Sequence, residues 1–274
     1  MKLSVVITTR NEEANIANCI RSFDGRRDDV EVIVVDNSST DRTKEIAAEL
    51  GATVLDKGPE RSAQRNLGWR TAKAEWVVIL DADMILPRET LDEIVSIASS
   101  SPDADRPLAY WIPEVRTGSG IRTKARNFER SFYDGTCIDA LRLFSKSVLE
   151  KTGGYDENLI AGPEDWELDI RVLATGAQCE VLSHNLVHNE HELSFGRLMS
   201  KKAYYSRSMA AYQAKWAGHP ALRKQFGFFY RYVGVFVEKG KWRRLLRHPI
   251  LAAVMYVERI AVGFVYLASR LRCA

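Results

Sequence analysis

The first 80 residues alternate short apolar segments with longer amphipathic ones, and this alternation limits the folds that the chain can adopt. The apolar, β-branched segments have the length and composition of buried strands and span residues 3–8, 30–36, 53–55 and 76–80. Helical patterns separate them at residues 12–23, 40–50 and 61–72. Strands that alternate with helices predict an α/β fold, with a mostly parallel sheet between two layers of helices.

Two carboxylates follow the fourth strand segment directly, in the D-x-D sequence Asp81-Ala82-Asp83. Open α/β sheets bind their ligands at the C-terminal ends of the strands. Carboxylates this close repel each other unless a hard cation such as Mg²⁺ or Mn²⁺ neutralises them, and such an ion commonly completes its shell with substrate phosphates. A solvated acidic turn is the alternative for a lone D-x-D.

Polar segments also follow the first two strand segments, at residues 8–12 and 36–41. Asp36 could accept a hydrogen bond from a base or a ribose, and Ser38, Ser39 or Thr40 would cap the next helix, whose N-terminus attracts anions. Helix capping alone explains the hydroxyl groups, but it does not explain three polar strand ends at one edge. The sequence has neither common Gly-rich phosphate loop, which argues against P-loop hydrolysis and a dinucleotide-binding fold.

The segments 5–12, 34–41 and 80–83 together resemble the three N-terminal signatures of family 2 glycosyltransferases, and the likeness covers about residues 1–200. The resemblance implies a GT-A fold, a UDP- or GDP-type sugar donor, a Mg²⁺ or Mn²⁺ cofactor and inversion of the anomeric centre. On this basis we expect the nucleotide sugar to be bound by Thr8, Arg10, Glu12, Asp36, Ser38, Arg61, Arg65, Asp81 and Ala82. The expected metal ligands are Asp83, Asp81 and His188.

A second pair of acids, Glu164 and Asp165, precedes Trp166 at the start of a predicted helix. The pair resembles the Glu-Asp motif of the family, in which one carboxylate acts as the base. An acceptor hydroxyl must lose its proton as it attacks the anomeric carbon from the face opposite the diphosphate. We predict that Asp165 is this base, that Glu164 orients it or binds the acceptor, and that Trp166 contacts the acceptor. The alternative is a simple interaction of both acids with the helix macrodipole.

Two histidines follow that helix, His188 and His191, and their spacing is not that of a zinc protease. Many GT-A enzymes have a histidine after the Glu-Asp helix that completes the metal shell or contacts the diphosphate. His188 ends a strand-like segment at residues 181–187 and matches that position better than His191. A surface histidine without a role is the alternative for either residue.

We predict a catalytic domain over residues 1–192 and a helical region over residues 193–274. The catalytic domain should also contain strands at residues 108–115 and 141–145 and a helix at residues 164–174. Within residues 197–247 there are 13 Lys and Arg side chains against one acid, and 11 aromatic side chains. This charge indicates an anionic partner or a solvated helical face. The expected acceptor contacts in this part are Lys201, Lys202 and Tyr205.

The tail, residues 250–268, is apolar except for Glu258 and Arg259. A charged pair at the centre of a membrane span is costly, so we predict an interfacial or packing helix. An interfacial helix would belong to a peripheral enzyme at the inner face of the plasma membrane with a lipid-linked or cell-envelope glycan acceptor. A packing helix would form a homodimer interface. Four scattered cysteines and the lack of a signal-like N-terminal segment predict a cytoplasmic location.

Two other function classes remain as alternatives. A nucleotidyltransferase that makes nucleotide sugars normally needs a Gly-rich, basic N-terminal loop, whereas residues 8–12 are glycine-free and contain an acid. A nucleic-acid-binding protein could use the basic, aromatic helices, but the aligned acids would then have no purpose. We therefore expect no nucleic-acid partner and predict a metal-dependent, inverting glycosyltransferase.

Overall fold

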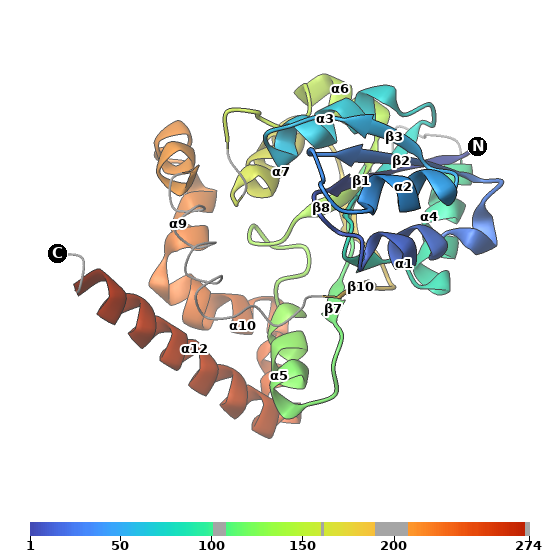
Figure 1. Cartoon of the computed structure of the whole chain (residues 1–274). Helices are drawn as coiled ribbons and strands as arrows, with labels where there is room; N and C mark the ends of the chain where they lie inside the picture. The colour runs from blue at the N-terminus through green and yellow to red at the C-terminus, as the bar shows by residue number, and fades with distance from the viewer. Residues whose placement is uncertain (101–107, 160–161, 190–207, 272–274) are drawn as a thin grey trace.

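The computed structural model describes residues 1–100, 108–159, 162–189 and 208–271, with side chains as far as residue 261. A seven-stranded sheet of order β3-β2-β1-β4-β8-β6-β9 forms the middle layer of the α/β part, at the upper right in Figure 1. The strands are β1 (Leu3–Thr9), β2 (Val30–Asp36), β3 (Thr53–Asp56), β4 (Trp76–Asp81), β6 (Ala109–Trp111), β8 (Leu141–Ser145) and β9 (Cys179–Val181). The first four run parallel, and β8 is antiparallel to β4 and to β6. The predicted α/β sheet is confirmed.

Helices cover both faces of this sheet (Figure 1). One face carries α1 (Ile16–Arg21), α2 (Thr43–Glu49) and α4 (Arg88–Ser99), and the other carries α3 (Arg61–Thr71), α6 (Lys146–Thr152) and α7 (Glu164–Ala174). Successive side chains of a strand point to opposite faces. Val5 and Ile7 of β1 therefore pack in the core below α1, and Val6 packs in the core below α3. The predicted helices at residues 12–23 and 40–50 are shorter than expected.

Two residues of α3 hold this helix in place, Gly68 against the sheet and Asn66 against the backbone of Tyr155. A Cβ atom at Gly68 would lie 2.2 Å from Val6 Cγ1, so only glycine fits this contact with β1. The Asn66 side chain donates to the carbonyl oxygen of Tyr155 at 2.8 Å and accepts from its backbone N–H at 2.8 Å. These contacts fix α3, which carries Arg61 and Arg65 toward the ends of β1 and β4.

A small second sheet of order β5-β10-β7 lies beside the large one and consists of β5 (Met84–Ile85), β10 (Leu186–His188) and β7 (Glu114–Arg116). It corrects two predictions, since residues 108–115 and 181–187 were each expected to form one strand. The first segment divides at Pro113, which has no N–H to donate to a ladder. The second divides where Glu93 accepts hydrogen bonds from the N–H groups of Ser183 and His184. Each segment thus contributes to both sheets.

The described C-terminal part is helical, as predicted, and packs on α5 (Ile121–Arg130). Its elements include α9 (Pro220–Phe226), η2 (Tyr230–Gly234), α10 (Val235–Val237), η3 (Glu238–Gly240), α11 (Trp242–Arg247) and α12 (Pro249–Leu271). In the N-terminal part, a short helix η1 (Asp24–Arg26) lies between α1 and β2. Phe132, Tyr133, Phe236 and Met255 form a separate core between α5 and these helices. Among the helices that the structure describes, none combines the length and apolarity needed to span a bilayer. The predicted domain boundary at residue 192 lies outside the described residues.

Candidate active site

The polar ends of three parallel strands lie at one edge of the large sheet. In the strand register, Thr8 of β1 is opposite Asp81 of β4, and Thr9 is opposite Asp36 of β2. The predicted alignment of polar strand ends is therefore confirmed. Polar groups that follow separate buried strands come together here because parallel strands end at the same edge.

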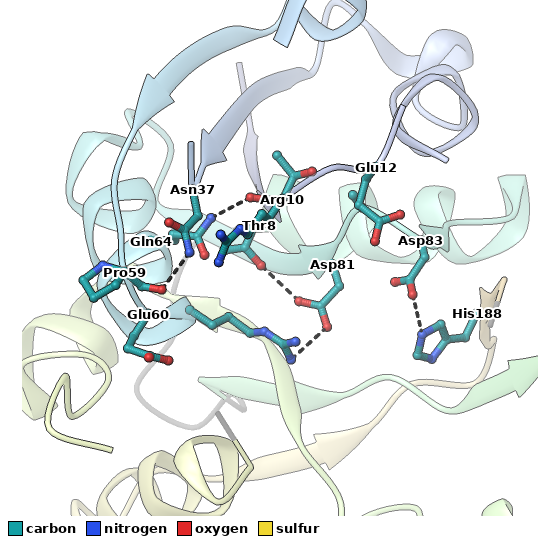
Figure 2. A pocket seen from close by; sticks show the side chains of 13 residues that line it. Thr8, Arg10, Glu12, Asn37, Pro59, Glu60, Gln64, Asp81, Asp83 and His188 are labelled. Atoms are coloured by element: carbon teal, nitrogen blue, oxygen red, sulfur yellow. Dashed lines mark hydrogen bonds and ion pairs between the residues drawn. The ribbon is translucent and has the colours of Figure 1, made fainter. Parts of the chain in front are cut away.

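A pocket of about 420 Å³ opens at this edge (Figure 2). Its volume falls in the range of small-molecule sites. The side chains that line it come from the ends of β1, β2 and β4, from α3 and from β10, and they are Thr8, Thr9, Arg10, Glu12, Asn37, Pro59, Glu60, Arg61, Gln64, Asp81, Ala82, Asp83 and His188. The contributions of Thr9, Asn37, Pro59, Glu60 and Gln64 were not predicted from sequence, because no charge pattern marks these residues. Three predicted nucleotide-sugar contacts, Asp36, Ser38 and Arg65, do not line this pocket.

The Asp81 carboxylate is held by three partners. It accepts a hydrogen bond from Thr8 Oγ1 at 3.0 Å, and it lies 3.5 Å from Arg61 Nη1 and 3.4 Å from Arg65 Nη2. Burial by itself would raise the pKa of Asp81, but Arg61 and Arg65 outweigh burial and hold that pKa well below its usual range. Asp81 is therefore ionised at neutral pH.

Arg65 joins this side of the pocket to the second pair of acids. Its side chain is 1% exposed, and its Nη1 lies 2.6 Å from Asp165 Oδ1 and 3.5 Å from Glu164 Oε1. Both acids begin α7, so α3 and α7 are connected through one buried guanidinium. Burial, and then the charge of Asp165, raise the pKa of Glu164, which favours its neutral form.

Asp83 faces His188 across the pocket (Figure 2). Because β10 runs antiparallel to β5, the backbone N–H of Asn189 donates to the carbonyl oxygen of Asp83 at 2.8 Å. The side chains also meet, since His188 Nε2 lies 3.1 Å from Asp83 Oδ2. The small second sheet therefore brings together two residues that are 105 positions apart.

Glu114 of β7 holds the other nitrogen of the His188 ring. Its Oε1 lies 2.5 Å from His188 Nδ1, and its Oε2 lies 2.9 Å from Arg130 Nη2. Burial would lower the pKa of His188, but the hydrogen bonds that the ring donates to Asp83 and Glu114 raise it to about 9. Glu114 was not predicted from sequence, because the predicted continuous strand at residues 108–115 does not reveal that Glu114 lies beside β10.

The donor set beside His188 fits a divalent cation. Asp83 Oδ1 is buried and has no hydrogen-bond partner among the described residues, so one carboxylate oxygen remains available. A carboxylate that fixes the second nitrogen of a histidine is typical of metal-ligating histidines. Within the described ranges, no three His, Cys, Asp or Glu side chains gather as a complete metal site. Asp83 and His188 would thus be the protein ligands, with phosphate oxygens in other positions.

The remaining predicted residues lie around the pocket or beyond it. Both oxygens of Asp36 accept hydrogen bonds from Ser39, from its N–H at 2.7 Å and from its Oγ at 2.5 Å. Ser38 is exposed with a φ of 54° and does not cap α2. Trp166 packs against the rings of Tyr212 and Phe226. Four further predicted residues fall outside the described ranges, namely His191, Lys201, Lys202 and Tyr205.

This fold, with a polar pocket at the strand ends, is the GT-A fold of nucleotide-sugar-dependent glycosyltransferases. A mannosyltransferase from Pyrobaculum calidifontis, solved in complex with GDP-Man and Mn²⁺, is similar over 100% of this chain and 81% of its own, with a TM-score of 0.60 and 20% identity. Glucosyl-3-phosphoglycerate synthase from Mycobacterium tuberculosis, solved with Mn²⁺, UDP and glucosyl-3-phosphoglycerate, is similar over 77% of this chain and 78% of its own, with a TM-score of 0.56 and 20% identity. At these identities the likeness establishes the fold.

The family follows from the sequence. The family model described as glycosyl transferase family 2 matches residues 4–153, more than half of the chain, and the chain belongs to this family. An uncharacterised glycosyltransferase of Rickettsia typhi is 45% identical over 113 residues, which is 40% of this chain and 37% of that protein. The low-salt glycan biosynthesis hexosyltransferase Agl6 of Haloferax volcanii is 36% identical over 166 residues, which is 54% of this chain and 39% of that protein. The matched region spans about two fifths of the length of these relatives.

Proposed function

We propose that this chain is a metal-dependent, inverting glycosyltransferase that transfers a sugar from a UDP- or GDP-type nucleotide sugar to an acceptor hydroxyl. This proposal rests on Asp83 Oδ1, which is buried beside His188 in a pocket at the strand ends and has no hydrogen-bond partner in the part of the chain that the structure describes. The solved relatives support the donor and metal class, since one was solved with GDP-Man and Mn²⁺ and the other with UDP and Mn²⁺.

The pocket residues divide between the nucleotide and the metal. Thr8, Arg10 and Glu12 line the pocket at the end of β1, and Arg61 lies where it can meet a phosphate or ribose oxygen. Asp83 and His188 would hold Mg²⁺ or Mn²⁺, and Asp81 stays a predicted further ligand. When bound, the cation would neutralise the charge that develops on the leaving diphosphate.

The acids of α7 would act on the acceptor. In an inverting transfer the acceptor oxygen attacks the anomeric carbon opposite the diphosphate, the bond to the diphosphate breaks, and the hydroxyl proton passes to a base. Asp165 is the proposed base, because it is partly exposed while Arg65 fixes one of its oxygens at 2.6 Å. Glu164 is buried and would orient Asp165 or bind the acceptor.

The proposed acceptor is a lipid-linked or cell-envelope glycan, met at the cytoplasmic face of the membrane. The name of the Haloferax volcanii relative, a glycan biosynthesis hexosyltransferase, supports a glycan acceptor. Acceptor contacts are proposed for Trp166, Lys201, Lys202 and Tyr205, and a homodimer is the alternative use of the C-terminal helices. The catalytic part would end near residue 192. Family membership favours glycosyl transfer over nucleotidyl transfer and nucleic-acid binding.

Donor turnover tests this proposal. A thermal-shift screen of UDP-, GDP- and TDP-sugars with Mg²⁺ or Mn²⁺ should identify a donor, whose slow hydrolysis releases the nucleoside diphosphate. Asp83→Ala should abolish metal-stimulated release, and Asp165→Asn should lower transfer to an added acceptor by roughly 10²–10⁴-fold. The matched control is Asp92→Asn, which alters an exposed ion pair with Arg26. Wild-type turnover in either variant would contradict the assignment of that residue.

A further inference from the structure

The long helix α12 has two different faces. On its inner face, Met255 is buried in the core that contains Phe236, and Arg259 contacts Glu129 and the Tyr133 hydroxyl of the segment at the end of α5. The helix contacts α5 at the lower edge of the molecule and runs obliquely away from it (Figure 1). The contacts of its inner face hold it against α5 and this core.

The outer face of α12 is apolar and exposed. Ile250 is 71% exposed and Val257 is 67% exposed, and Ala253 and Ile260 are exposed as well. These positions follow each other at intervals of three or four residues, which places them on one stripe of an α-helix. An apolar stripe of this kind on a helix that already has a packed inner face indicates a contact with something else.

The preceding helix α11 adds cations and further apolar groups. Trp242 and Leu246 are exposed and lie four residues apart, so they share one side of α11. Arg243 and Arg247 have the same spacing and are also exposed, and the Arg243 guanidinium lies 5.6 Å from the centre of the Trp242 ring. This helix contacts α12 directly, and Arg247 precedes Ile250 of the apolar stripe by three residues.

The charge around this surface favours an anionic partner. Residues 208–271 contain 11 Lys and Arg side chains and two acids, a net charge of +9, and two of these cations, Lys215 and Arg259, pair with acids outside this range. Both acids are paired, Glu238 with Lys241 at 3.5 Å and Glu258 with Arg122 at 2.8 Å. A two-fold dimer through this surface would bring like cations together, because each copy presents the same patch to the other. An anionic lipid surface instead attracts the cations and accepts the apolar side chains.

We propose that the outer face of α12, together with Trp242, Leu246, Arg243 and Arg247 of α11, docks on an anionic lipid bilayer. The helix would lie in the plane of the headgroups, with its apolar stripe toward the acyl chains. This surface extends the proposed function by naming the partner that would carry a lipid-linked acceptor. Binding of the protein to lipid vesicles is measured without donor, metal or turnover. A protein that does not bind vesicles can therefore be distinguished from one that does not transfer a sugar.

Flotation with vesicles tests the docking surface. The full chain should float with vesicles that contain phosphatidylglycerol at low salt, much less at high salt, and weakly with pure phosphatidylcholine. Each Arg near an anionic surface increases the affinity for the membrane about fivefold, so the double variant Arg243→Gln/Arg247→Gln should bind the vesicles roughly 25-fold more weakly. The variant Ile250→Glu/Val257→Glu should lose binding, and its melting temperature should not change because both side chains are exposed.

The matched control is Leu173→Glu, which changes an exposed apolar residue of α7. This variant should float like the wild type. Absence of flotation with anionic vesicles, or flotation that Ile250→Glu/Val257→Glu leaves unchanged, would overturn the proposal. A lipid-free dimer in analytical ultracentrifugation that the same double variant dissociates, with no vesicle binding, would assign the surface to a second copy of the chain.

Discussion

Replacement of Arg65 by methionine should destabilise the protein strongly, because this guanidinium lies among three carboxylates. Its side chain is 1% exposed, and its nitrogens lie 2.6 Å from Asp165, 3.5 Å from Glu164 and 3.4 Å from Asp81. The guanidinium carbon also lies 5.0 Å from the centre of the Tyr155 ring. Methionine keeps much of the apolar volume, so the variant isolates the loss of charge and hydrogen bonds.

The expected loss can be estimated from buried ion pairs. Removal of one partner typically costs about 3–5 kcal/mol, since it leaves an uncompensated charge in the interior. At about 2 °C per kcal/mol for a chain of this size, the melting temperature should fall by about 6–10 °C. The matched control is Arg70→Met on the same helix, because Arg70 is half-exposed and its pair with Glu157 is 3.7 Å long. An exposed pair of this kind contributes at most about 1 kcal/mol.

The stabilisation that Arg65 provides should decrease as the pH falls. Arg61 and Arg65 hold the pKa of Asp81 well below its usual range despite burial, so this pair adds stability above the ordinary carboxyl pKa and loses it as pH falls toward the lowered value. The difference between wild type and Arg65→Met should therefore be largest at neutral pH and shrink below about pH 4. Urea unfolding followed by circular dichroism, at neutral and at acidic pH, measures the free energy of unfolding of each variant and its dependence on pH. A loss at neutral pH no larger than that of Arg70→Met would refute the structural role of Arg65.

The other predictions concern the metal ligands and the contact of α3 with the sheet. Glu114→Gln should weaken Mn²⁺ binding in the presence of nucleoside diphosphate by about 10–100-fold, because His188 loses the carboxylate that orients it, and calorimetry without metal should show unchanged nucleotide binding. Gly68→Ala should destabilise by about 1–3 kcal/mol, since the new Cβ would meet Val6 at 2.2 Å, whereas Gly120→Ala, with nothing within 4 Å, should change little in the same unfolding assay. Chelation of divalent ions should stop donor turnover and leave the melting temperature of the nucleotide-free protein unchanged; full turnover in chelator would contradict the metal requirement.

The central strands were predictable from sequence because their own composition determines them. Residues 30–36 and 141–145 form β2 and β8 with the predicted bounds, and the helix at residues 164–174 is α7 as predicted. Residues 30–36 are rich in β-branched side chains and residues 141–145 are mostly apolar, and both strands are buried at every position, so local pattern and tertiary environment agree. The segments at residues 108–115 and 181–187 were each predicted as one strand and proved to be two. Their division depends on Pro113 and on the contact with Glu93, which local periodicity does not reveal.

By itself, the sequence determined the order of strands and helices, the polar groups at the strand ends, among them Asp81 and Asp83, and the Glu164-Asp165 pair at the start of a helix. These features are local, and the parallel topology brings the strand-end groups to one edge. Only the tertiary structure decided that Glu114 holds His188 opposite Asp83 and that Arg65 joins the two acidic pairs, because both contacts cross long sequence separations. The outer face of α12 was likewise decided by packing, since the sequence shows an apolar helix but not which of its sides α5 leaves uncovered.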